Sequence, residues 1–288
     1  MRSAGNWNQQ AKLTASDVAR GDEFGWSVSA SEDKVIIGAH FDDSGGAAYV
    51  FVRDGSSWRQ QQKLSANDEA SGDDFGYSVT LLEDIAVIGA IDNDDKGEES
   101  GSAYVFVLNG SNWIEQAKLT ANDGAADDQF GWSVAVSGDM VVIGTPRDDD
   151  NIGTDSGSVY MFPFTQISIN DVSLAEGGTG ATTLSFTVTR TNNYETVSVH
   201  YATADGTATT VDGDYTATSG IINFAAGDPL IQQVAIQVNG DHWIEANESF
   251  VVNLSNVTGN AVLIDDQGMG IIENDDFYNI FLPFVVNQ

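Results

Sequence analysis

Two acidic loops of this chain have the residue types and spacing of a divalent-cation site. Residues 92–101 read DNDDKGEESG and residues 148–157 read DDDNIGTDSG. Aligned by these letters, both loops carry acids at positions 1, 3 and 8 and glycine at position 6. Hard oxygen ligands on a loop that bends at glycine suit Ca2+, so we predict a calcium site in each loop. The proposed ligands are Asp92, Asp94 and Glu99 in the first loop, and Asp148, Asp150 and Asp155 in the second.

A second set of acids recurs as pairs five residues apart, each just before a Phe-Gly dipeptide. Like charges about 4 Å apart repel by roughly 4 kcal/mol at an effective dielectric constant near 20, and a bound divalent cation relieves this repulsion. Aspartate also caps turns through its own backbone, so turn formation is the alternative interpretation. The pairs are Asp17 and Asp22, Asp68 and Asp73, and Asp123 and Asp128. A shorter loop, FDDSGG, follows the first Phe-Gly repeat, and we expect weak or no binding at Asp42 and Asp43.

The composition limits the classes of partner. The net charge of −32 over 288 residues disfavours nucleic acid and anionic membranes. It fits either cation sites or the solvated acidic surface of a salt-adapted protein. The absence of cysteine excludes disulfides, thiolate nucleophiles and cysteine-ligated zinc. No run of 18 apolar residues predicts a transmembrane helix, and no signal peptide is visible at the N-terminus.

The acids lie between strand-like segments that repeat three times. Phe24-Gly25, Phe75-Gly76 and Phe130-Gly131 share their spacing with a tryptophan-containing segment that ends in Lys-Leu. Each unit also contains a continuous apolar run such as KVIIGA and a segment such as SGSAYVFV. Four short β-branched or aromatic segments in about 50 residues predict one blade of a β-propeller.

These sequence motifs resemble the FG-GAP repeat of the integrin alpha-subunit propeller and its bacterial relatives. The resemblance implies a propeller part over residues 1–164, with repeats at about 7–57, 58–112 and 113–164. Propellers use about 4–8 blades, so three blades do not close a ring. Trp7 to Leu13 matches a last strand with no blade before it, and the third blade ends at Phe162 without such a strand. The segment either completes the third blade of another copy, as in a homo-oligomer, or the chain is a fragment of a larger propeller.

From about residue 165 the sequence changes to short alternating runs that predict an antiparallel β-sandwich. The words YATADGTATTVDGDY, WIEANESFVVNLSN and GIIENDD resemble a Calx-beta domain over residues 165–276. The resemblance implies an immunoglobulin-like sandwich with calcium ligands at one end, although Gly240 and His242 replace two acids of the richer sites. The matching ligands are Glu176, Asp214, Asp241, Glu245, Asp275 and Asp276. Residues 277–288 form an apolar tail, for which an added strand is the first expectation and a surface-retention signal or an interface are the alternatives.

The sequence therefore predicts an all-β protein, a partial propeller followed by a sandwich, and not an enzyme. The words GWSVS and GYSVT lack the last glycine of a nucleophile elbow. His40, His200 and His242 occur without a partner signature. The favoured function is a non-catalytic, Ca2+-binding extracellular or cell-surface module for adhesion, recognition or cell communication, with a protein or glycan ligand. The alternatives are a scaffold fragment of a larger secreted enzyme, and an acidic salt-tolerant structural protein without specific ion sites.

Overall fold

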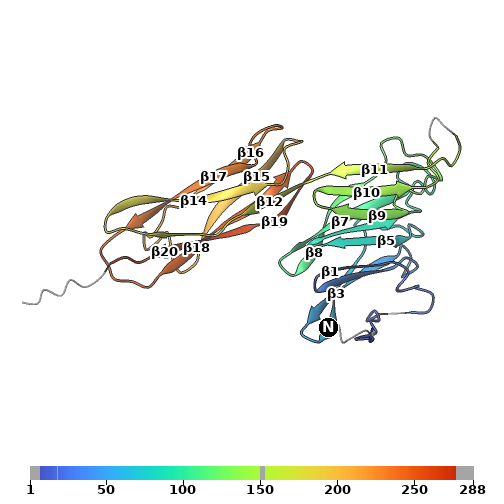
Figure 1. Cartoon of the computed structure of the whole chain (residues 1–288), viewed down its shortest axis with the longest axis horizontal. Helices are drawn as coiled ribbons and strands as arrows, with labels where there is room; N and C mark the ends of the chain where they lie inside the picture. Colours follow the sequence, from blue (N-terminus) through green and yellow to red (C-terminus); the bar gives the residue numbers. More distant parts are fainter. Residues whose placement is uncertain (1–6, 18, 150–152, 277–288) are drawn as a thin grey trace, which may run out of the picture. The chain divides into compact units, whose positions relative to one another are not determined.

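The computed structural model describes residues 7–17, 19–149 and 153–276, and every regular element in them is a β-strand (Figure 1). The chain divides into two compact units, Met1–Phe164 and Thr165–Gln288. In the described residues no helix is long and apolar enough to cross a membrane. The tail at 277–288, predicted to be a strand, lies outside the described residues.

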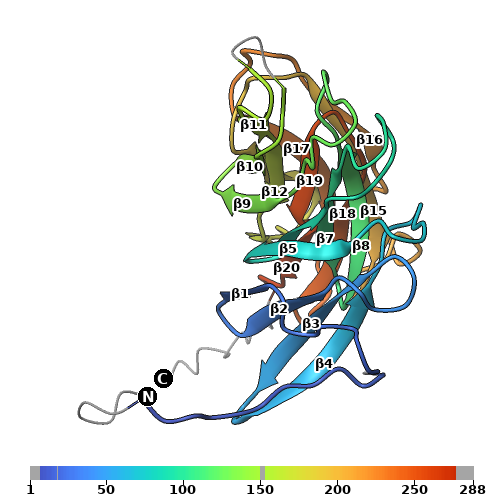
Figure 2. The same ribbon diagram turned by 90° about the vertical axis from the view of Figure 1, so that its right-hand side faces the viewer.

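The first unit contains three antiparallel sheets that follow one another along the chain (Figure 2). The first sheet contains β1 (Val28–Ser31), β2 (Lys34–Ala39), β3 (Ala47–Asp54) and β4 (Ser57–Leu64). The second contains β5 (Phe75–Leu82), β6 (Ile85–Ala90), β7 (Ser102–Asn109) and β8 (Asn112–Leu119). The third has only β9 (Ser133–Ser137), β10 (Met140–Thr145) and β11 (Ser158–Pro163). We refer to these sheets as the first, second and third blades.

Neighbouring blades stack through the apolar runs predicted from the sequence. Ile36 and Val50 of the first blade share a buried cluster with Phe75 and Ile88 of the second. The Phe-Gly dipeptides lie where the blades come closest. A Cβ atom on Gly76, whose φ is +95°, would lie 2.2 Å from the carbonyl oxygen of Ala47. Only glycine fits this contact without moving the backbone.

Residues 7–13 are not a strand in the structure, although their letters match β4 and β8. A β-strand needs a neighbour for its backbone hydrogen bonds, and residues 7–13 pair with no strand in the described structure. Trp7 is 95% exposed as a result. The third blade has the complementary defect, because β11 is its outermost strand and has no fourth strand beside it.

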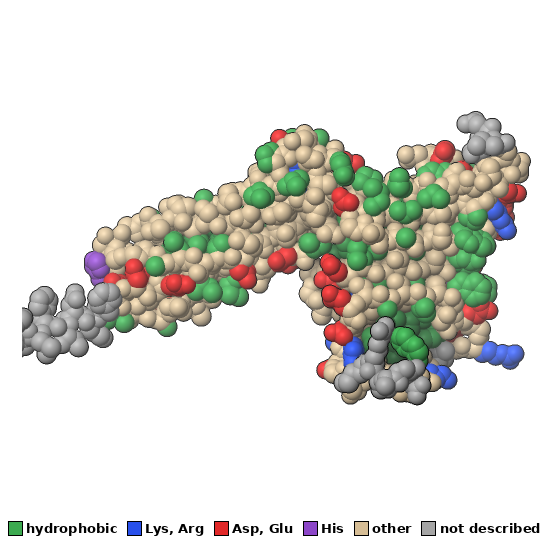
Figure 3. All heavy atoms as spheres, viewed as in Figure 1, with side chains coloured by type: hydrophobic (Ala, Val, Ile, Leu, Met, Phe, Trp, Pro, Cys, Tyr) green, Lys and Arg blue, Asp and Glu red, His purple; other side chains and the backbone are tan. Residues whose placement is uncertain are grey.

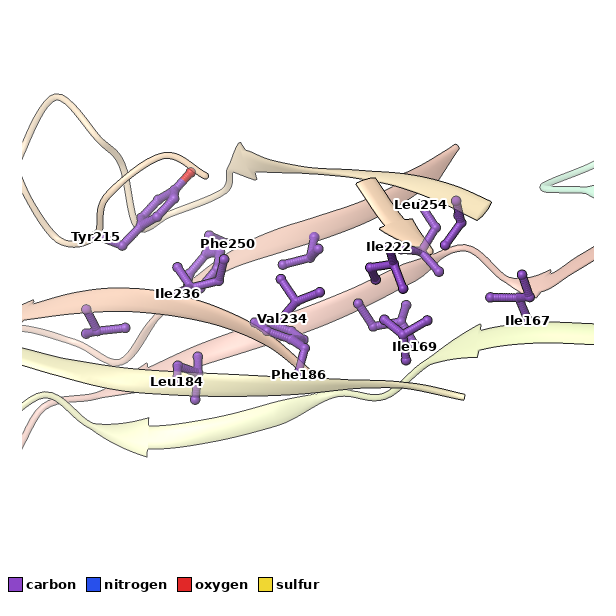
Figure 4. Close-up of a cluster of buried hydrophobic side chains, with 14 of the residues drawn as sticks. Ile167, Ile169, Leu184, Phe186, Tyr215, Ile222, Val234, Ile236, Phe250 and Leu254 are labelled. Atoms are coloured by element: carbon purple, nitrogen blue, oxygen red, sulfur yellow. The ribbon is translucent and has the colours of Figure 1, made fainter. Parts of the chain in front are cut away.

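The second unit is a sandwich of two sheets. One has the order β17-β14-β12-β19 and the other has the order β13-β20-β18-β15-β16. The strands are β12 (Thr165–Ile169), β13 (Val172–Ala175), β14 (Gly180–Arg190), β15 (Val197–Asp205), β16 (Ser219–Phe224), β17 (Ile231–Gly240), β18 (Glu248–Thr258), β19 (Ala261–Asp265) and β20 (Gln267–Glu273). Inward-facing residues such as Phe186, Val234 and Phe250 fill the space between the sheets (Figure 4).

The predicted antiparallel sandwich needs one correction. The chain crosses from one sheet to the other between β12 and β13, at Asn170 and Asp171. Because of this crossing, β12 pairs parallel with β19, and β13 pairs parallel with β20. The second parallel pair matters for the site, because the ends of β13 and β20 point to the same end of the sandwich.

Candidate functional site

The loops at one end of the sandwich bring four acidic segments together. Ala175 pairs with Glu273 at the ends of β13 and β20, so Glu176 and Asp275 leave their strands side by side. Gly180 pairs with Gly240, which places the β17–β18 loop at the same end. Asp205 pairs with Phe250, which adds the β15–β16 loop. We call this end of the sandwich, with its predicted ligands Glu176, Asp214, Asp241, Glu245, Asp275 and Asp276, the acidic end.

Three carboxylates converge most closely in the acidic end. Glu176, Asp275 and Asp276 each offer an oxygen within 4.8 Å of the other two. Glu176 is buried, with 6% of its surface exposed. The backbone N–H of Gly177 donates to Oδ1 of Asp275 at 3.2 Å, which fixes the loop after β13. Oδ2 of Asp276 is buried and has no hydrogen-bond partner in the described residues. A buried carboxylate oxygen without a donor is costly, and a cation would satisfy it.

Burial and neighbouring negative charges raise the pKa values of two glutamates in the acidic end. Burial raises the pKa of Glu176 to about 6, and the charges of Asp241, Glu245, Asp276 and Asp275 add to the rise. Burial also raises the pKa of Glu245, with further contributions from Asp241 and Asp214. These causes place Asp241 and Glu245 within electrostatic reach of the converging carboxylates. The Nδ1 atom of His242 lies 3.8 Å from Oδ1 of Asp276.

Glu248, at the start of β18, is a site residue that the sequence analysis missed. Burial raises its pKa to about 7, followed by the charge of Asp214 and a hydrogen bond with it, and by the charges of Glu245 and Asp212. Asp214 is held in place because the N–H of Thr209 donates to its Oδ2 at 2.6 Å. In the sequence, Glu248 is the first residue of ESF in the segment WIEANESFVVNLSN.

Steric crowding explains why glycine occupies position 240, where richer Calx-beta sites carry an acid. A Cβ atom on Gly240 would lie 1.8 Å from the carbonyl oxygen of Gly177. The loops after β13 and β17 therefore pass too close for any side chain here. The acidic end has the oxygen donors for one compact cation site. Asp214, Glu245 and Glu248 add further carboxylates beside it. Oxygen donors of this kind fit calcium better than softer metals.

The propeller loops are arranged differently from their predicted alignment. The N–H of Gly46 donates to the carbonyl of Asp42, that of Gly101 to Asn93, and that of Gly157 to Asp148. The match of Asp92 to Asp148 is therefore wrong by one residue, and Asn93 is the counterpart of Asp148. The third-blade loop has one more residue than the second-blade loop between these hydrogen-bonded positions. The two sequences can therefore be aligned by residue type in a register that their backbones do not share.

The predicted ligands of the second-blade loop are only partly together. Burial raises the pKa of Asp92 to about 6, followed by the charges of Asp74 and Glu99. Asp94 instead turns back on its loop, where its Oδ1 accepts the N–H of Glu99 at 2.9 Å. Across the described residues, the acidic end of the sandwich is the only place where three or more possible ligand residues offer atoms within 4.8 Å of one another.

In the third-blade loop the predicted ligands separate further. Asp148 accepts hydrogen bonds from Ser158 and, at 3.2 Å, from Tyr160. The N–H of Asp155 donates to Asp149 at 2.7 Å, in the way that Glu99 donates to Asp94. Asp150 lies outside the described residues.

The acid pairs before Phe-Gly form hydrogen bonds that stabilise local turns. The second member of each pair is buried and accepts the N–H of the residue three positions earlier, as Asp73 does from Ala70 at 3.0 Å. The same contact recurs at Asp22 and Asp128. These are turn caps, in agreement with the alternative interpretation. In the first blade, Lys63 pairs with Asp42 at 3.1 Å and with Asp43 at 2.7 Å.

His40 joins two blades rather than standing alone. Its ring nitrogens lie 3.2 Å from Asp74 and 3.3 Å from Glu23, and the side chain is 4% exposed. Nothing in its neighbouring letters pointed to this contact, because the two acids lie 17 and 34 residues away in sequence.

Comparison with known proteins agrees with the fold. The FG-GAP repeat family model matches residues 7–51, 58–106 and 113–162, and the Calx-beta domain model matches residues 164–276. Integrin alpha-7 of Homo sapiens is 27% identical over 170 residues, which cover 51% of this chain and 14% of the integrin. This chain therefore aligns with about a seventh of that relative's length.

Solved structures of Calx domains resemble the sandwich. A crystal structure of the apo form of the Calx CBD1 domain is 25% identical, with 39% of this chain and 99% of that chain covered at a TM-score of 0.36. CBD12 from CALX1.2 is 24% identical over 38% of this chain and 46% of that chain, at a TM-score of 0.35. A structure described as the calcium binding domain CBD12 of CALX1.1 matches equally well.

Proposed function

This chain belongs to the FG-GAP repeat proteins and carries a Calx-beta domain, and on that basis we propose that it is a non-catalytic, calcium-binding module of the cell surface or extracellular space. Its role in this proposal is adhesion or recognition of a protein or glycan. The human relative with similar repeats is an integrin alpha subunit, which supports adhesion as the class of function.

The convergence of Glu176, Asp275 and Asp276 is the observation that carries the proposal. Three carboxylates with oxygens within 4.8 Å of one another repel strongly unless protons or cations lie among them. At neutral pH protons are scarce, and few basic groups are available in a chain with 11 Lys and Arg against 43 Asp and Glu. A calcium ion matches the hard donors and satisfies the buried Oδ2 of Asp276. A structure similar to the sandwich is described as a calcium binding domain.

Calcium in this proposal rigidifies the chain rather than taking part in a reaction. The acidic end is formed by loops that approach from both sheets, and without an ion their carboxylates push these loops apart. A bound ion links the β13 end to the β20 end and draws in the β17–β18 loop through Asp241 and Glu245. Because the chain has no disulfides, ion binding is the available means of stiffening these loops outside the cell.

The propeller loops are proposed as weaker cation sites. Burial, with the charges of Asp74 and Glu99, raises the pKa of Asp92 in the second blade, which supports a site there. The oxygen of Asp94 that faces the N–H of Glu99 is already used, so Asp94 offers its second oxygen. In the third blade, Asp148, Asp150 and Asp155 are proposed as ligands of a separate, weaker site, in which Asp148 takes the place of Asn93 rather than of Asp92. Figure 3 shows acidic side chains on the surface.

Thermal unfolding of the chelated full chain tests the proposal. We expect micromolar-to-millimolar Ca2+ to raise the unfolding temperature, and equal Mg2+ or matched ionic strength from NaCl to raise it much less. Equal effects of the three salts would mean simple screening of an acidic surface and would overturn the proposal.

A second readout locates the effect in the acidic end. Trp243 lies in the β17–β18 loop and is 73% exposed, so chymotrypsin has access to this loop. Calcium should protect the bond after Trp243 from cleavage, while the bond after the exposed Tyr194, in the β14–β15 loop, is cleaved at the same rate with and without calcium. Unchanged cleavage at Trp243 would contradict binding in this loop.

A further inference from the structure

The outer edge of the third blade is an incomplete structure. In the other blades, β3 and β7 pair with the fourth strands β4 and β8, but β11 has no such neighbour. The N–H of Phe164 bonds to the carbonyl of Asp139 on the inner side. Because backbone groups alternate along a strand, Val159 and Met161 present theirs to the open edge. Pro163 also faces that edge but lacks an N–H, so it can accept a hydrogen bond from a partner strand but cannot donate one.

The face of the third blade beyond β11 is apolar and uncovered. Val159 and Met161 are each 67% exposed. Their counterparts in the second blade, Ala103 and Val105, are 0% and 8% exposed because another blade covers them. Figure 3 shows hydrophobic side chains gathered on the surface near β11. The third blade therefore lacks both a fourth strand and a neighbouring blade.

The chain contains an unused copy of the missing strand. Residues 7–13 read WNQQAKL, β4 contains WRQQQKL and β8 contains WIEQAKL. Trp113 of β8 is 3% exposed, whereas Trp7 is 95% exposed. The segment has the letters of a fourth strand, but it is not paired in the described structure.

Charge complementarity selects β11 as the partner of this segment. In the first blade, Lys63 of β4 lies 5.5 Å from the ring centroid of Tyr49 and pairs with Asp17 at 3.0 Å. In the second blade, Lys118 of β8 lies 5.2 Å from that of Tyr104 and pairs with Asp68. We call such a tyrosine with its acids a lysine socket.

The third blade has the same socket without its lysine. The hydroxyl of Tyr160 donates to Asp123 at 3.0 Å and interacts with Asp148 at 3.2 Å. No lysine or arginine forms an ion pair with Asp123 or Asp148 in the part of the chain that the structure describes. By its place in the repeat, the matching lysine is Lys12, which likewise has no ion pair among the described residues.

The same chain does not supply Lys12 to its own third blade. Leu13 and Ala15 pack with Tyr49 and Phe51 on one face of the first blade. The opposite face of that blade, with Ile36 and Val50, packs on the second blade. The segment therefore leaves the first blade on the side away from the third.

We propose that residues 7–13 of a second copy of this chain form the fourth strand of the third blade. By analogy with β7 and β8, Lys12 of the second copy lies opposite Tyr160, and Leu13 and Ala11 lie opposite Val159 and Met161. The first blade of the second copy then covers the exposed apolar face. Reciprocal exchange between two copies places six blades in one ring, within the range of about 4–8 blades that propellers use.

The mass of the full chain in solution is the first test. Light scattering should give twice the chain's 30.6 kDa. Lys12→Glu puts a carboxylate into the socket and should weaken association at least about tenfold. Asn8→Ala is the matched control, because its counterparts Arg59 and Ile114 are exposed in β4 and β8. A monomer at all accessible concentrations, or a dimer that Lys12→Glu leaves unchanged, would overturn the proposal.

A cross-link tests the register and does not depend on the stability of the Lys12 variant. The chain has no cysteine, so Ala11→Cys and Met161→Cys introduce the only thiols. A mixture of the two single variants should form a mixed disulfide between chains under mild oxidation, while neither variant alone forms one efficiently. A disulfide within one chain in the double variant, or no disulfide in the mixture, would contradict pairing between copies.

Discussion

Replacing Glu176 by glutamine should have opposite effects with and without calcium. The pKa of Glu176 is about 6 against an ordinary value of 4.5, because of burial and the acids around it. At 1.36 kcal/mol per pH unit, its ionised form costs the folded state about 2 kcal/mol at pH 7.5. The amide keeps the shape and removes the charge. Without calcium, Glu176→Gln should therefore stabilise the sandwich by about 1–2 kcal/mol, or roughly 4–8 °C.

With calcium the same variant should lose its advantage. Calcium at a hundred times its dissociation constant should stabilise the original chain by about 2.7 kcal/mol. Glu176→Gln removes one charged ligand, so we expect at least about a tenfold loss of affinity and a much smaller rise in unfolding temperature.

Differential scanning calorimetry of the full chain, in chelator and in calcium, measures both effects of Glu176→Gln. Glu195→Gln is the control, because it makes the same charge change in the exposed β14–β15 loop at the opposite end of the sandwich. It should behave like the original chain. A Glu176→Gln variant that is less stable in chelator, or that responds to calcium as strongly as the original, would refute the reasoning.

Three further predictions concern the rest of the molecule. In chelator, the unfolding temperature should fall as the pH rises from about 4.5 to 7. Glu176 and Glu248, with pKa values of about 6 and about 7, hold protons in the folded state that the unfolded chain has released. A rise in the unfolding temperature over this pH range, measured by calorimetry, would count against the acidic end as described. Gly76→Ala should lower the free energy of unfolding by about 3 kcal/mol or more in a denaturant titration, since its Cβ would lie 2.2 Å from the carbonyl oxygen of Ala47. The control Gly138→Ala, with φ +59° and open space around it, should lower it by about 1 kcal/mol. Equal losses would contradict the close approach of the blades. Lys118→Met should lower the free energy of unfolding by about 2 kcal/mol, because Asp68 and Asp95 lose their charged partner, while Lys96→Met should change it little.

Most of the fold was predictable because its signals are local and repeated. The apolar runs ending in Gly38, Gly89 and Gly144 are the central strands of their blades. The alternating runs around Phe186 and Phe250 became the inner faces of the sandwich. The switch of the chain between sheets at Asn170 was missed, because two short runs separated by polar residues look like one strand in sequence.

The candidate site was less predictable, because it depends on distances between segments. Glu176 and Asp275 are 99 residues apart and meet only through the parallel pairing of β13 with β20. Glu248 was overlooked because its perturbed pKa arises from Asp214 across the β15–β16 loop, and no spacing along the chain reveals that contact. The propeller loops were misaligned by one residue because acids are so common there that several alignments fit. Backbone bonds from Gly101 and Gly157 resolved the register.

Isothermal titration calorimetry of the chelated full chain tests the central claim most directly. We predict a saturable calcium isotherm with at least one site per chain and a much weaker response to magnesium. We also predict loss of the tightest site in Asp276→Asn, which removes the charge of a carboxylate whose buried Oδ2 has no hydrogen-bond partner in the described residues. An isotherm without calcium binding up to millimolar concentration, or one that Asp276→Asn leaves intact, would contradict the account.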